Sequence, residues 1–173
     1  VLACSAAAYV VYDYFHWPLN KMTVYATNNY YPSWARTIAT FRLMQVSACH
    51  DDQYLPSSTL SFMVALMDDD STDQDRSKVL FRHFQSVGCD VNGANRGLRP
   101  LHGAILFRNA NLAAFLIERG ANPSLVVMPP NRHAGFDSYQ WAEWACSRPG
   151  RSCAKLMEAL HATAPNNRIE RTR

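Results

Sequence analysis

The sequence predicts an all-α protein built as a solenoid of about three stacked helix-turn-helix units with short hairpins. Three observations lead to this prediction. Apolar residues recur at helical spacing along much of the chain. The segments Gly-Cys-Asp-Val-Asn and Gly-Ala-Asn-Pro-Ser begin at Gly88 and Gly120, 32 positions apart, so the chain contains an internal repeat. The length of 173 residues, of which 48% are hydrophobic, suits one well-buried domain.

The first segment, residues 1–20, is apolar and aromatic. Residues 1–12 carry no charge, and an aromatic run follows up to Trp17. A bilayer-spanning helix needs about 20 apolar residues, so this stretch is too short to span but suits the end of a membrane helix or a signal sequence. Aromatic side chains favour the membrane–water interface. We therefore consider membrane contact through residues 1–17, with an apolar helix that packs as a cap as the alternative.

Residues 21–54 are predicted to form an N-terminal helical cap on the stack. A helix is expected to begin at Ser33, directly after Pro32, and to run to about Cys49. Four large apolar residues recur at helical spacing along it: Trp34, Ile38, Phe41 and Met44.

The clearest repeat lies in the middle of the chain, where residues 97–104 spell Gly-Leu-Arg-Pro-Leu-His-Gly-Ala. Pro100 suits the first turn of a helix because its missing N–H would have no partner there, and Gly120 suits a left-handed helix end. The segment resembles the core motif of the ankyrin family, Gly-x-Thr-Pro-Leu-His-x-Ala, with Arg99 in place of Thr. The resemblance implies that His102 hydrogen-bonds adjacent backbone and braces the hairpin.

Weaker copies flank this repeat, so ankyrin repeats are expected over residues 55–163. Upstream, the expected helices are 59–66 and 79–84. Downstream, residues 135–142 align with residues 97–104, and the second helix of this copy is expected over 152–160 with Ser152 as its N-cap. The acidic stretch 68–75 is interpreted as a solvated, mobile insertion. Calcium binding is the weaker alternative, since the stretch lacks the glycine and the closing glutamate of an EF-hand loop. The basic tail, 164–173, is interpreted as a solvated terminus.

The candidate functional residues are expected to bind a protein partner. Ankyrin stacks bind through their concave face and hairpin tips, and large aromatic residues and arginine are enriched in binding hot spots. The expected concave-face residues are Leu106, Phe107, Arg108, Trp141 and Trp144. The expected hairpin-tip residues are Asn92, Asn95, Arg96, Arg132 and His133. In the alternative interpretation, the N-terminal segment folds back and covers the apolar residues of this face.

Several other functions find no support in the sequence. The 17 Lys and Arg residues are scattered and the net charge is only +3, so no nucleic-acid partner is expected. No motif predicts a cofactor, a metal site or an enzyme. Cys49 stands beside His50 and Asp51, but adjacent residues rarely meet as nucleophile and base. Cys146 and Cys153 lie seven positions apart, and spacing alone leaves a disulfide and two free thiols equally open.

The sequence thus predicts a protein–protein binding module, and we consider an exported or membrane-tethered inhibitor of the immunity type. The inhibitor idea is an analogy of architecture. The alternative is a structural or assembly subunit of a larger membrane complex. A membrane-tethered or extracytoplasmic (periplasmic) location is expected, and a cytoplasmic one otherwise.

Overall fold

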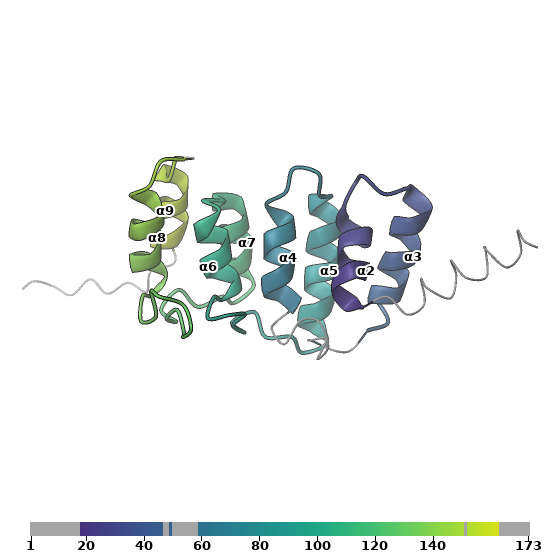
Figure 1. Cartoon of the computed structure of the whole chain (residues 1–173), viewed down its shortest axis with the longest axis horizontal. Helices are drawn as coiled ribbons and strands as arrows, with labels where there is room; N and C mark the ends of the chain where they lie inside the picture. Colours follow the sequence, from purple (N-terminus) through teal and green to yellow (C-terminus); the bar gives the residue numbers. More distant parts are fainter. Residues whose placement is uncertain (1–17, 47–48, 50–58, 151, 163–173) are drawn as a thin grey trace, which may run out of the picture.

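The computed structural model describes residues 18–46, 49, 59–150 and 152–162. Over these residues the chain forms eight α-helices and no strand, which confirms the all-α class. The helices stand side by side as pairs along the long axis of the molecule (Figure 1). The pairs are α2 (Leu19–Thr27) with α3 (Ser33–Leu43), α4 (Thr59–Met67) with α5 (Gln74–Ser86), α6 (Pro100–Leu106) with α7 (Ala110–Glu118), and α8 (Ser138–Cys146) with α9 (Ala154–His161).

The first helices of successive pairs form a row. Helix α2 contacts α4, α4 contacts α6, and α6 contacts α8. In the second row, α7 contacts α9. This arrangement buries a continuous core between pairs that could not bury their apolar faces alone. Among the largest fully buried side chains are Phe81 and Phe84 of α5, Ile105 of α6 and Leu116 of α7.

Local signals in the sequence set the helix ends. The carboxylate of Asp137 accepts hydrogen bonds from the backbone N–H groups of Tyr139 and Gln140 in the first turn of α8. Gly88 and Gly120 follow α5 and α7 with positive φ angles of 96° and 94°, as their predicted role as helix stops requires. One predicted cap is displaced: the N-cap of α9 is Cys153 rather than Ser152.

The N-terminal pair differs most from the prediction. Helix α2 was not predicted, and α3 ends at Leu43 instead of near Cys49. Trp34, Ile38 and Phe41 of α3 face solvent, and the buried residues of the helix are Ala35, Ala39 and Leu43. The reason is close packing, because the small alanine side chains let α2 and α3 approach each other.

The acidic stretch is anchored to the turn between α2 and α3, although Asp69, Asp70 and Asp75 are exposed as the predicted solvated insertion implies. The backbone oxygen of Ser71 accepts a hydrogen bond from the Asn29 N–H at 2.8 Å, and the Asp73 N–H donates to Thr27 O at 2.7 Å. Thr72 between them is buried. The carboxylate of Asp73 is also the N-cap of α5. The stretch therefore joins α5 to the turn between α2 and α3.

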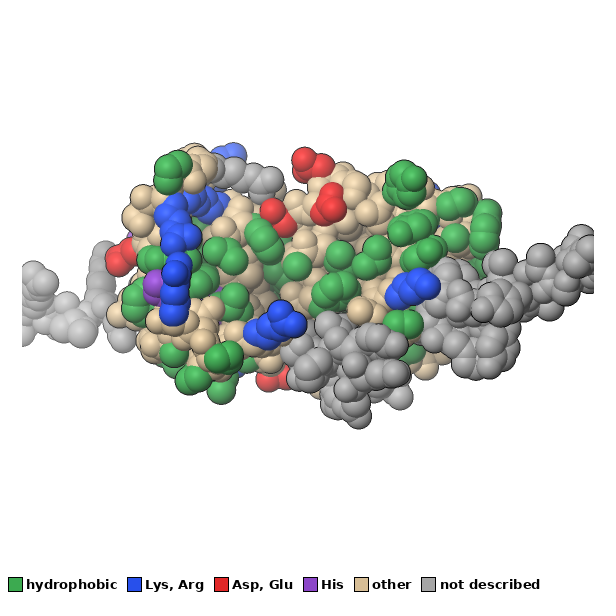
Figure 2. Space-filling model, in the orientation of Figure 1, with side chains coloured by type: hydrophobic (Ala, Val, Ile, Leu, Met, Phe, Trp, Pro, Cys, Tyr) green, Lys and Arg blue, Asp and Glu red, His purple; other side chains and the backbone are tan. Residues whose placement is uncertain are grey.

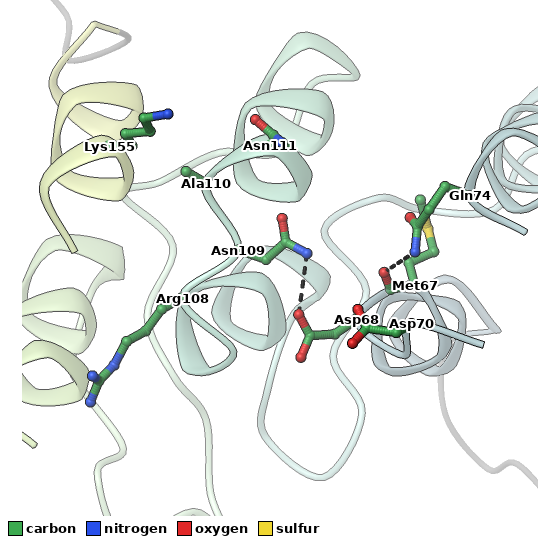
Figure 3. A pocket seen from close by; sticks show the side chains of 9 residues that line it. All are labelled: Met67, Asp68, Asp70, Gln74, Arg108, Asn109, Ala110, Asn111 and Lys155. Carbon is green, nitrogen blue, oxygen red and sulfur yellow. Dashed lines mark hydrogen bonds between the residues drawn. The ribbon is translucent and has the colours of Figure 1, made fainter. Parts of the chain in front are cut away.

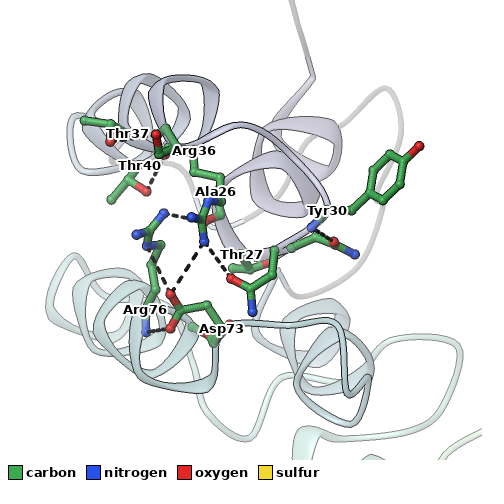
Figure 4. Close-up of polar contacts among 12 residues, drawn as sticks. Ala26, Thr27, Tyr30, Arg36, Thr37, Thr40, Asp73 and Arg76 are labelled. Carbon is green, nitrogen blue, oxygen red and sulfur yellow. Dashed lines mark hydrogen bonds and ion pairs between the residues drawn. The ribbon is translucent and has the colours of Figure 1, made fainter.

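Two arginines reinforce this joint (Figure 4). Arg36 Nη1 lies 4.0 Å from Asp73 Oδ2 and donates to Asn29 Oδ1 at 2.6 Å. Arg76 Nε lies 3.7 Å from the same Asp73 oxygen, and Arg76 Nη1 donates to Ala26 O at 3.3 Å. The polar cluster fixes how α3 is turned relative to α5, and so which of its faces points away from the protein.

Two disulfides tie the helix pairs together. Cys146 and Cys153 are bonded, which decides between the two alternatives left open by their spacing. Cys49 is bonded to Cys89, a pairing that was not predicted. It links the chain after α3 to the loop after α5.

Among the described residues, no helix has both the length and the apolar character needed to cross a membrane. Residues 1–17, for which membrane contact was considered, and the basic tail 164–173 both lie outside the described residues.

Candidate functional site

An apolar cavity lies between α4 and α6 on the face formed by the first helices. Its volume is about 210 Å³, and Leu106 and Phe107 line it from α6. From α4 come two small side chains, Ser61 and Ala65. Leu106 is 40% exposed, which is high for a leucine on a helix, so this predicted contact residue is accessible.

A second cavity continues on the other side of Leu106 and Phe107. It has a volume of about 280 Å³ and is lined also by Asp68, Pro149 and Gly150. The two residues therefore form an apolar ridge between two hollows. Such a ridge can insert between side chains of a partner while the hollows receive the partner's own side chains.

Arg108, a predicted contact residue, makes hydrogen bonds within the protein itself. Its Nη2 donates hydrogen bonds to the carbonyl oxygens of Ala145 and Arg148, the latter at 2.8 Å. Its φ angle is 54°, a left-handed value that turns the chain from α6 into α7. Arg108 thus fastens this turn to the end of α8.

The prediction that Trp141 lies on the exposed face is wrong. Only 2% of Trp141 is exposed, and its indole Nε1–H donates to the His102 carbonyl oxygen at 2.8 Å. The ring packs edge-on against the His102 imidazole of α6, with 6.2 Å between the ring centroids, and belongs to the hydrophobic core. Trp141 therefore holds α8 on α6 and is not available to a partner.

Trp144 is half-buried at the rim of the same face. Its ring stacks on Trp141 with 4.5 Å between centroids, and His133 lies 4.3 Å away. The Arg148 guanidinium sits 4.0 Å from its centroid, a cation–π arrangement. Burial lowers the pKa of His133, and the positive charges of Arg132 and Arg148 lower it further, so the ring is held neutral at neutral pH.

The tip residues divide into structural and accessible ones. Asn92 Oδ1 accepts from the Asn122 N–H at 2.8 Å and its Nδ2 donates to Gly120 O, so this side chain joins successive loops. Asn95 pairs with Leu98 through the backbone, and its Oδ1 is buried without a hydrogen-bond partner. Arg96 and Arg132 are exposed. Basic side chains form a column over the α8 end of this face, and acidic ones gather above α4 (Figure 2).

Two arginines that were not predicted as site residues, Arg99 and Arg148, shape this face. Arg99 Nη1 donates to Asn92 O within its own loop, and Arg99 Nε donates to Val126 O in the next loop, so this side chain bridges two loops. Arg148 covers Trp144 and follows α8. The departure from the motif was a usable signal for Arg99. Nothing in the local sequence marked Arg148, because its role depends on where α8 ends.

His102 is buried in the centre of this region. Its Nδ1 accepts a hydrogen bond from the Arg99 N–H at 3.3 Å, as the family resemblance implied. Burial lowers the pKa of His102 from its usual 6.5 to about 4, although interaction with the Leu125 backbone opposes the shift.

This pKa predicts acid sensitivity. Between pH 6.5 and 4 the unfolded chain binds a proton at His102 that the folded protein does not, so stability is complete above pH 6.5 and falls as the pH approaches 4. We expect the loss from this residue to reach about 3 kcal/mol. Urea unfolding across this range should show a shallower pH dependence for His102→Gln than for the wild type. His161→Gln, at an exposed helix end, is the control, and equal slopes in all three proteins would contradict the prediction.

A polar cavity of about 320 Å³ lies beside the face, among the turns α4–α5 and α6–α7 and the start of α9. Asp68, Asp70 and Lys155 point toward it (Figure 3). Asn109 Nδ2 donates to Asp68 Oδ1 at 3.2 Å. No three His, Cys, Asp or Glu side chains come together as a metal site would need within the part of the chain that the structure describes. Cys49, considered above as a nucleophile, is held in a disulfide.

The chain matches no protein-family model, no curated protein and no solved structure.

Proposed function

We propose that this protein is an ankyrin-type binding module that recognises a protein partner through the face of α4, α6 and α8. The observation that carries the proposal is the half-exposed apolar ridge of Leu106 and Phe107, set between two cavities. The motif at 97–104 and the linked loops around Asn92 support the ankyrin assignment. Ankyrin stacks bind their partners through an extended concave surface, and the face of α4, α6 and α8 would be that surface here.

The charge around the ridge indicates the chemistry of the partner segment. Arg96 lies at one end of the apolar cavity, and the exposed Arg132 and Arg148 lie toward α8. A segment with apolar side chains for the cavities and carboxylates for these arginines would match the face. Such charge complementarity increases the association rate and selects against basic partners.

The two disulfides indicate the kind of cellular compartment in which the protein would bind its partner. Disulfides persist in oxidising compartments and are rare in the cytosol. They support the proposal of an exported or membrane-tethered binder, for example an inhibitor that neutralises a secreted protein. In the alternative, an assembly subunit of a membrane complex, the same face would contact other subunits.

An affinity pull-down from the native host, followed by mass spectrometry, tests this proposal. We expect one stoichiometric partner whose affinity falls about tenfold or more in Leu106→Ser and in Arg96→Glu, since central apolar and arginine side chains dominate binding. Val79→Ser is the matched control, because Val79 on α5 is 43% exposed and lies outside the face. Capture of membrane subunits would favour the assembly role, and a partner that binds both variants as tightly as the wild type would place the site elsewhere.

A further inference from the structure

Four side chains meet at the α8 end of the face. We define the α8 donor cluster as these four residues: Arg132, His133, Trp144 and Arg148. The rings of His133 and Trp144 lie 4.3 Å apart. Arg132 Nε donates to His133 Nε2 at 3.1 Å, and the guanidinium carbon of Arg148 lies 4.0 Å from the Trp144 centroid. Both guanidinium groups therefore lie against the same pair of rings, at the end of the face where Figure 2 shows basic side chains in a column.

The position of Arg148 is fixed by contacts within the protein. The Cys146–Cys153 disulfide closes the turn that contains this residue. The Arg148 carbonyl oxygen accepts a hydrogen bond from Arg108 Nη2 at 2.8 Å, which ties the turn to the end of α6. A side chain that is already in place loses less entropy when it binds a ligand. The planar guanidinium adds to this effect, because its N–H donors have a fixed geometry.

The polar groups that the cluster leaves unpaired are all N–H donors. Within the described part of the chain, the Arg148 side chain donates no hydrogen bond, and the Arg132 side chain donates only through Nε. The indole N–H of Trp144 also donates to no described group, although the ring is half-buried. Since His133 Nε2 accepts a hydrogen bond, the proton of the neutral ring is on Nδ1. A site that offers donors without acceptors is suited to an anion.

The positive charge of the cluster is not balanced by a carboxylate of the described residues. Burial lowers the pKa of His133, and the charges of Arg132 and Arg148 lower it further, so both charges reach this ring. The Asp137 carboxylate accepts N–H groups of the first turn of α8. Glu143 on α8 forms no ion pair with either arginine. Two guanidinium charges thus lie on one pair of rings, and a bound anion would offset their repulsion.

The number of charges favours a phosphoryl group over a carboxylate. A carboxylate carries one charge on two oxygens, and the fork of a single arginine satisfies it. A phosphate monoester carries about −1.5 to −2 charges and three acceptor oxygens, which suffice for two arginines and an indole N–H. Arg132 and Arg148 are long, exposed side chains beside the same rings, so both can reach one anion.

We infer that the α8 donor cluster binds a phosphoryl group, with Arg132 and Arg148 as its charge partners and the Trp144 indole N–H as a further donor. The ligand is a phosphate monoester or free phosphate. This inference goes beyond the proposed function, because a small anion would bind without any protein partner. A carboxylate is the competing occupant, and the experiment separates the two.

Titration of the full chain with small anions tests the inference. Inorganic phosphate, glycerol phosphate and acetate are added separately at equal, low ionic strength, while NMR follows the Trp144 indole N–H and the His133 ring. We expect phosphate to bind about tenfold more tightly than acetate. Bound phosphate should also raise the pKa of His133, since a nearby negative charge favours the imidazolium. Tighter binding of glycerol phosphate would support an ester as the ligand, and equal binding would support free phosphate.

Three arginine variants complete the test. Arg132→Gln and Arg148→Gln should each bind phosphate about tenfold more weakly than the wild type. The matched control is Arg82→Gln, because Arg82 is an exposed arginine whose guanidinium carbon also lies over an aromatic ring, 5.9 Å from the centroid of Phe115. The control should bind phosphate as the wild type does, and all three variants should keep the wild-type melting temperature.

Three results would overturn the inference: no phosphate binding by the wild type, acetate binding as tight as phosphate binding, or an equal loss in the control and in the two cluster variants. The wild-type comparison of phosphate with acetate stands even where a variant destabilises the turn. A partner captured through Leu106 while phosphate fails to bind would leave the proposed function intact, so the two proposals fail separately.

Discussion

Removal of the Cys49–Cys89 disulfide is expected to cost about 4 kcal/mol of the free energy of unfolding. The bond closes a loop between residues 40 positions apart, and closing a loop lowers the entropy of the unfolded chain. The Cys146–Cys153 bond spans only seven positions, so its removal should cost about 2 kcal/mol by the same reasoning. The larger loss corresponds to a decrease in melting temperature of about 10 °C for a chain of this length.

The comparison of two double variants measures this difference. Cys49→Ala/Cys89→Ala and Cys146→Ala/Cys153→Ala should each be unfolded thermally and in urea beside the wild type. Addition of a reductant to the wild type should lower its stability by at least the larger of the two losses. Equal losses in the two variants would show that loop length does not govern the effect.

Gly97→Ala is expected to destabilise the protein by about 4 kcal/mol, the sum of about 1–2 for a left-handed backbone and about 1–3 for overpacking. The φ angle of Gly97 is 81°, and a Cβ atom there would collide with the carbonyl oxygen of Met128. The colliding atom belongs to the backbone of the next hairpin, whose N–H donates to Gly97 O at 2.8 Å. Relief of the collision therefore requires the two hairpins to separate.

Gly120→Ala separates the steric effect from the backbone effect. Gly120 has a similar φ angle of 94°, but the space around its absent Cβ is open within 4 Å. We expect a loss of about 1.5 kcal/mol for this control. Chemical denaturation of the two variants should therefore differ by at least 2 kcal/mol, and similar losses would refute the close approach at Gly97.

The existence of helices α4 to α9 was predictable from local signals, although α5 begins at Gln74, five residues before its predicted start. Helix α4 ends one residue beyond its predicted limit, and α6 begins at Pro100, which fits only a first turn. Gly88 and Gly120 have the positive φ angles expected of helix stops. Each signal depends on the backbone of one segment, so no tertiary contact was needed to detect it.

The errors concern contacts between segments. The apolar stripe of α3 was taken as its buried face. In the structure the alanine side of the helix is buried instead, because small side chains allow closer packing. Trp141 was predicted as a partner contact, yet its indole has a hydrogen-bond acceptor only in the neighbouring helix. The Cys49–Cys89 pair was equally invisible, since its two members are far apart in the chain and lack a spacing rule. Of the ten candidate site residues, Leu106, Arg96 and Arg132 are the ones whose accessibility the sequence predicted well.

The buried hydrogen bond between the Trp141 indole and the His102 carbonyl oxygen can report local opening of the last helix pair, α8 and α9. The α8–α9 pair is attached to the rest of the described protein mainly through α6 and α7, so it is the pair that can detach while the others stay folded. The indole proton can exchange with solvent only when that detachment occurs. Its exchange rate in deuterated water, read from a single resonance, would therefore report how often the terminal pair opens without global unfolding.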